Sequence, residues 1–377
     1  MKKLVLAPDS FKGTMSSATI CELMKHAIIA HYPNAEVISL PIADGGEGSV
    51  EAFVSALDGS YVTCKVNNPH WEEITATYGL LPDATAIIEV AAAVGLPLVD
   101  ESHDVGMATT FGVGQLIIDA INRGSKKIII GLGGSSTNDG GTGAAAACGV
   151  KFFDVQGKSF IPVGSTLNQI AHIDVSQIKP ELKACKFISM CDVDNPLFGI
   201  NGAAYVYGPQ KGADQETIEF LDAGLHHLSN VIKSDSGIDI QNIPGAGAAG
   251  GMGGGMIAFL NSELHQGIEV VLDLVRFNEA LENADLVITG EGRLDSQSLD
   301  GKAVVGVSHR AKMKNIPVIA IVGDIGNNIL NIYEEGISGI FSINRVAMPY
   351  QQSKKRAAED LVLTVDNLMR LFKRLEL

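Results

Sequence analysis

A loop that combines glycine with hydroxyl side chains carries the strongest chemical signal in this sequence. Residues 131–143 hold six glycines among Ser, Thr, Asn and Asp, between an apolar strand expected at 127–130 and a small-residue helix expected at 144–147. The backbone N–H groups of such a loop can converge on an anion, and a helix N-terminus adds partial positive charge. A plain tight turn needs only one or two glycines, so the pattern favours a phosphate site over a turn that only packs small residues. The residues assigned to this site, as a nucleotide-binding loop, are Gly133, Gly134, Ser135, Ser136, Asn138, Asp139 and Gly140.

A second glycine-rich segment lies at 245–255 and contains seven glycines. Gly245, Gly247 and Gly250 form a Gly-x-Gly-x-x-Gly pattern, which in dinucleotide-binding proteins follows a strand and opens a helix. Here Pro244 precedes the pattern in place of a clean apolar strand. We therefore expect a loop or helix that packs closely against backbone or phosphate, and we assign Gly247 and Gly250 to the nucleotide site.

Short segments at expected strand ends add charged groups. Two carboxylates follow a strand expected at 186–190, and a lysine stands between glycines after a strand expected at 203–207. Each segment alone is typical of a solvated turn. Together they match phosphoryl transfer, in which cations offset the transferring charge, carboxylates hold Mg²⁺ and a base takes the hydroxyl proton. The candidate residues are Asp9, Ser10, Lys12, Asp44, Glu47, Asp192, Asp194, Lys211, Glu291, Arg293 and Asp295.

Other catalytic chemistries find less support in the sequence. The nine histidines include no His-Glu-x-x-His pair, and the chain has no Gly-x-Ser-x-Gly nucleophile motif. Cys191 follows a strand but stands beside carboxylates, which raise the pKa of a thiol and disfavour it as a nucleophile.

The elements that must position these residues alternate between strand and helix at both ends of the chain. Strands are expected at 3–7, 36–40, 285–289, 316–322 and 338–343, and helices at 17–30, 46–57, 302–314, 327–335 and 353–375. Such alternation predicts a doubly wound parallel sheet. We expect residues 1–60 and 276–377 to form one discontinuous α/β domain. Residues 61–275 would form a second α/β domain with a mixed sheet and the glycine-rich loops, inserted into the first.

Composition limits the partners of the chain. Its 377 residues are 46 % hydrophobic and 19 % charged, with a net charge of −15, which disfavours nucleic acid and anionic membranes as general partners. No apolar run is long enough for a membrane-spanning helix. Five cysteines without a Cys-x-x-Cys pair predict free thiols and a reducing cytoplasm. The oligomeric state is left open, and a homo-oligomer is compatible with the sequence.

Taken together, these segments resemble the bacterial type I glycerate kinases. The resemblance covers nearly the whole chain, in order, and the family often has Ala where this chain has Ser136. The segments that carry it include Asp-Ser-Phe-Lys-Gly at 9–13 and Gly-Pro-Gln-Lys-Gly-Ala at 208–213, with 43–48, 109–114, 131–143, 191–197, 244–251 and 290–295. The resemblance implies ATP-dependent phosphorylation of D-glycerate, with 2-phosphoglycerate as the product. It also implies a flavodoxin-like domain interrupted by a second α/β domain.

Within that expectation, physical chemistry suggests a role for each candidate group. Lys12, Lys211 and Arg293 would offset the transferring charge or bind the glycerate carboxylate, and the planar fork of Arg293 suits a carboxylate best. The acids Asp192 and Asp194 would hold Mg²⁺ or activate the glycerate hydroxyl. Substrate contacts are further expected from Ser10, Asp44, Glu47, Glu291 and Asp295, with Asp9 as a reserve catalytic acid. All of these groups are expected to converge on a cleft between the two domains.

Two other functions stay open at this point. One is a nicotinamide-dependent oxidoreductase of a small hydroxy acid, built on the pattern at 245–250. The other is a non-catalytic protein that binds a nucleotide or an organic acid. The spare carboxylates disfavour the latter, because a pure anion binder gains nothing from acids beside its anion.

Overall fold

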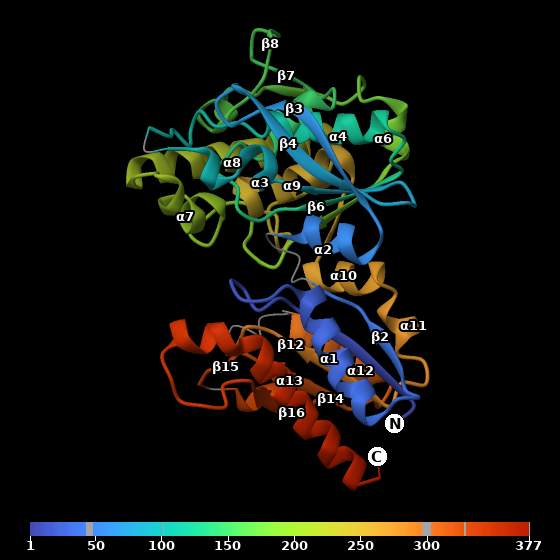
Figure 1. The fold of residues 1–377 in the computed structure, drawn as a ribbon. Coiled ribbons are helices and arrows are strands. Elements are labelled where there is room, and N and C mark those ends of the chain that lie inside the picture. Colours follow the sequence, from blue (N-terminus) through green and yellow to red (C-terminus); the bar gives the residue numbers. More distant parts are fainter. Residues whose placement is uncertain (43–47, 101, 296–302, 328, 377) are drawn as a thin grey trace. The chain divides into compact units, whose positions relative to one another are not determined.

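The computed structural model describes residues 1–42, 48–100, 102–295, 303–327 and 329–376 (Figure 1). Contacts divide the chain into two compact units. Unit 1 comprises Met1–Asp44, Ser55–Leu57 and Ile268–Leu377, and unit 2 comprises Gly45–Val54 and Asp58–Gly267. No helix in the described ranges has the length and apolar character needed to cross a bilayer.

Unit 1 is built around a five-stranded sheet in which every neighbouring pair is parallel. Its strands stand in the order β16-β14-β12-β1-β2. Their bounds are β1 (Lys3–Pro8), β2 (Glu36–Ser39), β12 (Leu286–Gly290), β14 (Val318–Val322) and β16 (Ile337–Ser342). Every residue of β12 and β14 is buried, as expected for parallel strands covered on both faces.

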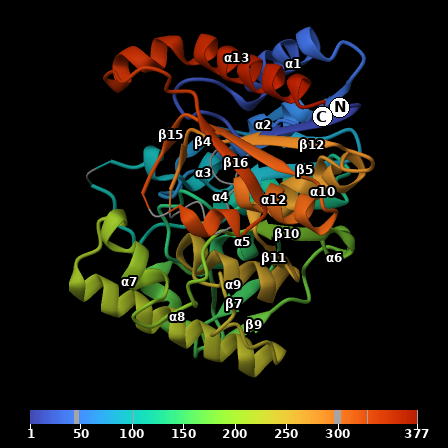
Figure 2. The same cartoon turned by 90° about the horizontal axis from the view of Figure 1, so that it is seen from below.

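Helices cover both faces of this sheet. Helices α1 (Ser17–His31) and α13 (Tyr350–Arg374) lie side by side on one face (Figures 1 and 2) and share a core with β1, β12 and β14. On the other face, α12 (Ala303–Met313) packs against β14. Unit 1 also contains a short parallel pair, a 3₁₀ turn and two further helices: β13 (Arg293–Leu294), β15 (Asp324–Ile325), η5 (Leu330–Tyr333), α10 (Gly267–Leu274) and α11 (Phe277–Ala280). The first residue of α10, Gly267, groups with unit 2.

Unit 2 contains a six-stranded mixed sheet in the order β11-β10-β6-β5-β4-β3. Strands β3 to β5 pair antiparallel, whereas β5, β6, β10 and β11 pair parallel, because the chain crosses over through helices after β5. The bounds are β3 (Ser60–Asn67), β4 (Glu73–Leu80), β5 (Thr85–Glu89), β6 (Lys127–Gly131), β10 (Lys186–Met190) and β11 (Glu263–His265). A small separate sheet has the order β8-β7-β9, from Ser159–Phe160, Lys151–Phe153 and His172–Asp174.

The helices of unit 2 bury the sheet and carry the loops that matter below. They are α2 (Ser49–Ala56), α3 (Ala91–Val94), α4 (Phe111–Asn122), α5 (Thr142–Ala147), α6 (Pro180–Ala184), α7 (Ala203–Tyr207), α8 (Gln215–Ser236) and α9 (Ala248–Leu260), with 3₁₀ turns at η1 (Leu96–Leu98), η2 (Gly164–Gln169) and η3 (Pro209–Lys211). Of these, α2 straddles the unit boundary, with its last residues grouped in unit 1.

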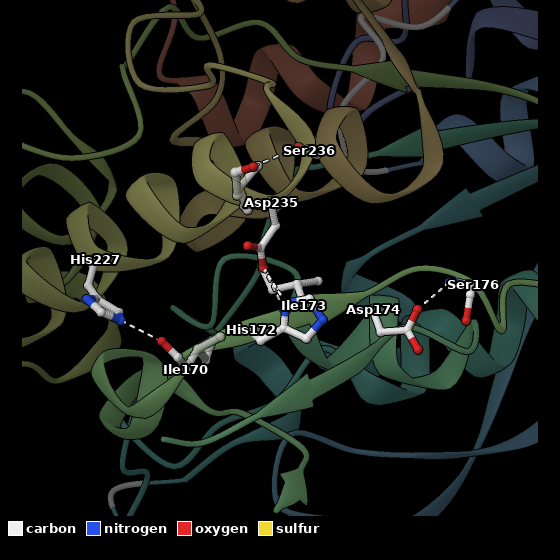
Figure 3. Close-up of polar contacts among 9 residues, drawn as sticks. Ile170, His172, Ile173, Asp174, Ser176, His227, Asp235 and Ser236 are labelled. Atoms are coloured by element: carbon white, nitrogen blue, oxygen red, sulfur yellow. Dashed lines mark hydrogen bonds and ion pairs between the residues drawn. The ribbon is translucent and has the colours of Figure 1, made fainter. Parts of the chain in front are cut away.

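Long helix α8 is fixed at its C-terminal half by polar contacts to the β9 region (Figure 3). The Asp235 carboxylate accepts hydrogen bonds from the Ile173 amide (2.8 Å) and from His172 Nδ1 (3.1 Å). His227 Nε2 donates to the Ile170 carbonyl at 2.7 Å. Helix α8 in turn brings Leu228 against Gly140, which leaves no room for a side chain there.

Two predicted elements were wrong. Residues 203–207 form helix α7 and not a strand, because a five-residue apolar run has no periodicity that separates the two. The helix expected at 327–335 is represented, within the described residues, by the 3₁₀ turn η5.

The unit bounds differ from the predicted ranges 1–60, 276–377 and 61–275. Residues 45–54 and 58–60 group with unit 2, where the Val50 amide donates to Glu89 at the end of β5 (3.0 Å). Residues 268–275 group with unit 1, where Arg310 of α12 donates to Asp273 of α10 (2.7 Å). The discontinuous domain organisation itself stays a prediction.

Candidate active site

A pocket of about 190 Å³ in unit 2, here called the unit 2 pocket, lies at the carboxyl ends of β6 and β10. Both the loop after β6 (132–135) and the turn after β10 (191–193) line it, so the two segments singled out in the sequence lie together. The rest of the wall comes from Tyr207, Gln210, Lys211, Ala248 and Ala249.

Three residues of the loop, Gly133, Gly134 and Ser135, line this pocket. Gly133 and Gly134 are exposed, and Gly134 adopts a φ of +74°, a left-handed conformation that favours glycine. Among the residues that the structure describes, the amides of Gly133, Gly134 and Ser135 donate to no protein acceptor. Successive unpaired amides beside a left-handed residue can form a concave anion-binding surface.

Lys211 is a buried cation in the wall of the same pocket. Its side chain is 3 % exposed, and its Nζ donates to the carbonyl of Thr137 at 2.7 Å. Burial lowers the pKa of Lys211 from 10.5 to about 8, and the nearby Asp139 carboxylate opposes that shift. The ammonium is therefore charged at neutral pH, in surroundings where its field is weakly screened.

Asp139 does not lie where a ligand could reach it, which corrects its assignment to the nucleotide. It is fully buried and accepts hydrogen bonds from the Thr110 amide and hydroxyl (2.8 Å each) and from the amides of Gly141 (3.1 Å) and Gly143 (3.2 Å). Burial raises the pKa of Asp139, while these hydrogen bonds oppose the rise. The start of α5 is thus occupied by the protein's own carboxylate, and it is not a phosphate site.

Two more loop residues, Ser136 and Gly140, have structural partners and need the same correction. Ser136 is fully buried, and its amide and hydroxyl both donate to Val94 O at 2.9 Å. The Gly140 amide donates to Gly250 O at 3.0 Å. Asn138 is also 0 % exposed, but its side-chain amide has no hydrogen-bond partner among the described residues, so its predicted role stays a prediction. Of the loop residues assigned from the sequence, only Gly133, Gly134 and Ser135 line the pocket.

The glycines at 247 and 250 serve close backbone packing. A Cβ on Gly247 would stand 2.3 Å from Pro196 O, and one on Gly250 would stand 1.9 Å from Thr137 O. The Gly247 amide already donates to Asn195 O (3.0 Å). Both residues are therefore corrected from nucleotide-binding to packing roles, and the dinucleotide interpretation of this segment loses its support.

Of the two carboxylates after β10, only Asp192 lines the pocket; Asp194 is exposed and is not among the lining residues. Asp192 Oδ1 accepts a hydrogen bond from the Gly267 amide at 2.8 Å, at the start of α10. Within the described ranges, no three His, Cys, Asp or Glu side chains cluster as a metal site. Because Mg²⁺ is commonly held by one or two carboxylates together with substrate phosphates, Asp192 could hold that ion at the pocket wall, and the metal role of Asp194 stays a prediction.

Unit 1 has a larger pocket of about 580 Å³, here called the unit 1 pocket. It lies at the carboxyl ends of β1 and β12, where the strand order reverses, the usual ligand position in open α/β sheets. Asp9 and Glu291 line it and are each 7 % exposed, and Ser10, Lys12 and Arg293 contribute as the sequence suggested.

The remaining candidates are Asp295, Asp44 and Glu47. Asp295 pairs with Arg293 (Nε to Oδ2, 3.4 Å) but is not among the lining residues. Asp44 and Glu47 lie outside the described residues.

The whole chain matches one family. The model of the glycerate kinase family matches residues 4–373. The chain belongs to the glycerate kinase family. It is 44 % identical over 373 residues to a glycerate kinase of Bacillus cereus, with 98 % of each chain covered. It is 43 % identical over 343 residues to the glycerate 2-kinase of Escherichia coli, with 90 % of each covered.

A solved structure agrees with the fold of this glycerate kinase family member. A crystal structure from Salmonella typhimurium LT2 that carries the provisional description glycerate kinase 2 matches with a TM-score of 0.90 and 40 % identity, over 100 % of this chain and 99 % of that one. The expectation of a mixed α/β fold with parallel sheets is thereby confirmed.

Sequence reasoning missed several pocket residues of this glycerate kinase family member. Tyr350, Ser353, Lys354 and Asp360, all on α13, line the unit 1 pocket. Only the apolar periodicity of α13 was visible in the sequence, and a polar residue on an amphipathic helix carries no motif. Tyr207 and Gln210 of the unit 2 pocket were also missed, because the sequence argument rested on the charge of the neighbouring Lys211.

Proposed function

We propose that this chain is a kinase that transfers the γ-phosphoryl group of ATP to D-glycerate and forms 2-phospho-D-glycerate. Full-length similarity to relatives named glycerate kinase and glycerate 2-kinase carries the proposal. The unit 2 pocket supports it, because unpaired amides, a buried cation and a carboxylate lie together there.

Each pocket group has a role in such a transfer. Lys211 and the amides of Gly133–Ser135 bind an anionic group, and Lys12 and Arg293 of the unit 1 pocket offset negative charge. Asp192 orients the acceptor hydroxyl and takes its proton as the phosphoryl group is transferred. Mg²⁺ would neutralise charge on the phosphates. A carboxylate that takes the hydroxyl proton is not at the same time a ligand of the ion, so Asp192 is proposed here as the base.

The finer description of the fold and location belongs to the same proposal. Unit 1 is proposed to be flavodoxin-like, which is supported by its parallel strands: in chain order they run 2-1-3-4-5 across the sheet. A cytoplasmic location is supported by five cysteines that are all free. The expected convergence of all candidate groups on a cleft between the domains stays a prediction.

A direct test is ADP formation from Mg-ATP with D-glycerate, glycolate, lactate or tartronate, followed by phosphorus NMR of the product. We expect ADP release that depends on D-glycerate and a product resonance of 2-phosphoglycerate. ADP release that is independent of every acid, or absent, would refute the proposed function. A 3-phosphoglycerate product would refute the regiochemistry alone.

A further inference from the structure

The two pockets differ in volume by about threefold, at about 190 Å³ in unit 2 and about 580 Å³ in unit 1. Pockets that enclose drug-sized ligands span about 300–1,000 Å³, and a three-carbon acid has only about a quarter of the non-hydrogen atoms of ATP. We infer that the unit 1 pocket binds ATP and that the unit 2 pocket binds glycerate. This inference rests on the proposed function, and it replaces the expectation that the 131–143 loop holds the ATP phosphates.

The chemistry of the unit 2 pocket suits a small hydroxy acid. The amides of Gly133–Ser135 and the ammonium of Lys211 supply donors and positive charge for one carboxylate. Asp192 accepts from a hydroxyl, and exposed Gln210 offers an amide that both donates and accepts. Such a set matches one carboxylate and two hydroxyls. Tyr207 lines the same pocket, and its hydroxyl donates to Asn195 Oδ1 (2.6 Å).

The unit 1 pocket has the parts that a nucleotide requires. Lys12, Arg293 and Lys354 give it three cations for a polyphosphate. Asp324 and Asn344, at the ends of neighbouring strands, can accept from ribose hydroxyls. The ring of Tyr350 is 60 % exposed in the same wall, where a base can stack on it.

Lys354 is the ligand contact that this assignment adds. It stands one turn into α13, and its Nζ lies 3.8 Å from the point where a Cβ on Gly13 would stand. The ammonium therefore reaches over the loop that follows β1, the loop that also carries Lys12 into the pocket. The next residue, Lys355, is also exposed but does not line the pocket, and it provides a matched control.

The first experiment is calorimetric titration of the full-length protein with the Mg²⁺ complex of a non-hydrolysable ATP analogue. Lys354→Met should raise the Kd of the analogue about tenfold and leave the KM for D-glycerate within about twofold. Lys355→Met should change neither value. Because Lys354 is exposed, both variants should melt at the wild-type temperature.

The second experiment tests the unit 2 pocket with a variant of Gln210. Gln210→Ala should raise the KM for D-glycerate about fivefold or more and leave the Kd of the ATP analogue unchanged. The assignment is overturned if Lys354→Met alters the glycerate KM and not the analogue Kd, if Gln210→Ala weakens the analogue, or if Lys354→Met and Lys355→Met behave alike. Wild-type protein that binds the analogue normally but forms no ADP with D-glycerate would refute the proposed function and leave the nucleotide assignment standing.

Discussion

Two glycine-rich segments of unit 2 are similar in composition but differ in how closely their glycines are packed. In the 131–143 loop, Gly133 has nothing within 4 Å of where a Cβ would stand, and its amide is unpaired among the described residues. In the 245–255 segment, a Cβ added to Gly247, Gly250 or Gly255 would stand within 2.3 Å of a carbonyl oxygen. At these glycines, the first segment leaves an amide open to a ligand and the second packs against other backbone, although Ala248 and Ala249 also line the unit 2 pocket.

The difference also explains how the segments depend on each other. The Gly140 amide donates to Gly250 O, and Gly250 lies against Thr137, whose carbonyl accepts from Lys211. The 245–255 segment thus packs against the 131–143 loop and holds its backbone in place. Substitutions of residues that line the unit 2 pocket, here called the exposed face, should therefore change activity. Substitutions where the 245–255 segment packs against the loop, here called the buried face, should change stability.

The largest effect is expected at the exposed face from Asp192→Asn. Asparagine keeps an oxygen that can accept from the Gly267 amide, so the free energy of unfolding should change by less than about 1 kcal/mol. Loss of the base should lower kcat by roughly 10²–10⁴-fold. Steady-state kinetics and urea unfolding of the same preparation check both values, and near-normal turnover would remove Asp192 from the mechanism.

Gly250→Ala probes the buried face. Its Cβ would clash with Thr137 O at 1.9 Å, and its φ of +67° is strained for alanine. We expect a loss of about 3 kcal/mol or more in unfolding free energy, from overpacking and backbone strain together. Denaturant titration measures it. A variant of wild-type stability that fails to bind substrate would mean that Gly250 contacts the ligand after all.

Lys211 lines the unit 2 pocket and also donates to Thr137 O, against which Gly250 packs. Both activity and stability should therefore depend on pH through its ammonium group. Because burial lowers its pKa to about 8 in the folded state, the unfolded chain binds an extra proton between about pH 8 and 10.5. Folding stability of the wild type relative to Lys211→Met should therefore rise with pH across that window. Activity should fall over the same range as the ammonium is lost, by about tenfold one pH unit above the pKa.

These two trends run in opposite directions, which makes the prediction specific to a functional cation. Paired pH profiles of turnover and of urea stability test it. Activity that stays level through pH 9.5 would reduce Lys211 to a loop-supporting residue.

The smallest effect on stability is expected from Gly133→Ala, the counterpart of Gly250→Ala. Open space surrounds its Cβ position, so the unfolding free energy should change by less than about 1 kcal/mol. The added methyl group crowds the amide surface, and kcat/KM should fall about tenfold through loss of a hydrogen bond to a charged group. A strongly destabilised Gly133→Ala would erase the contrast between the two segments.

Much of the fold was readable from the sequence because apolar runs and helical periodicity are local. The strand at 186–190 was predicted to the residue, and the mixed sheet of unit 2 was expected. The 203–207 run was mistaken for a strand since five apolar residues pack equally well in either form.

The candidate site could be predicted from the sequence only in part, because tertiary packing decides which groups reach a pocket. Composition shows that glycines are present, but whether an amide faces solvent or a carbonyl depends on tertiary packing. Asp139 illustrates this, because its acidic side chain in a glycine loop looked like a ligand group and instead binds the loop's own amides. Lys354 illustrates the reverse, as a helix-surface lysine that only the fold brings to a pocket.

Hydrogen exchange at the two glycine segments, followed by mass spectrometry with and without D-glycerate, tests the central claim most directly. In the free protein, residues 133–135 should exchange quickly, because their amides donate to no protein acceptor among the described residues. The amides of Gly247, Ala248 and Gly251 should exchange slowly, because they donate to the carbonyls of Asn195, Gly245 and Gly247. D-glycerate should slow exchange at 133–135 and leave these three amides unchanged. No protection at 133–135, or protection confined to 247–251, would contradict the account.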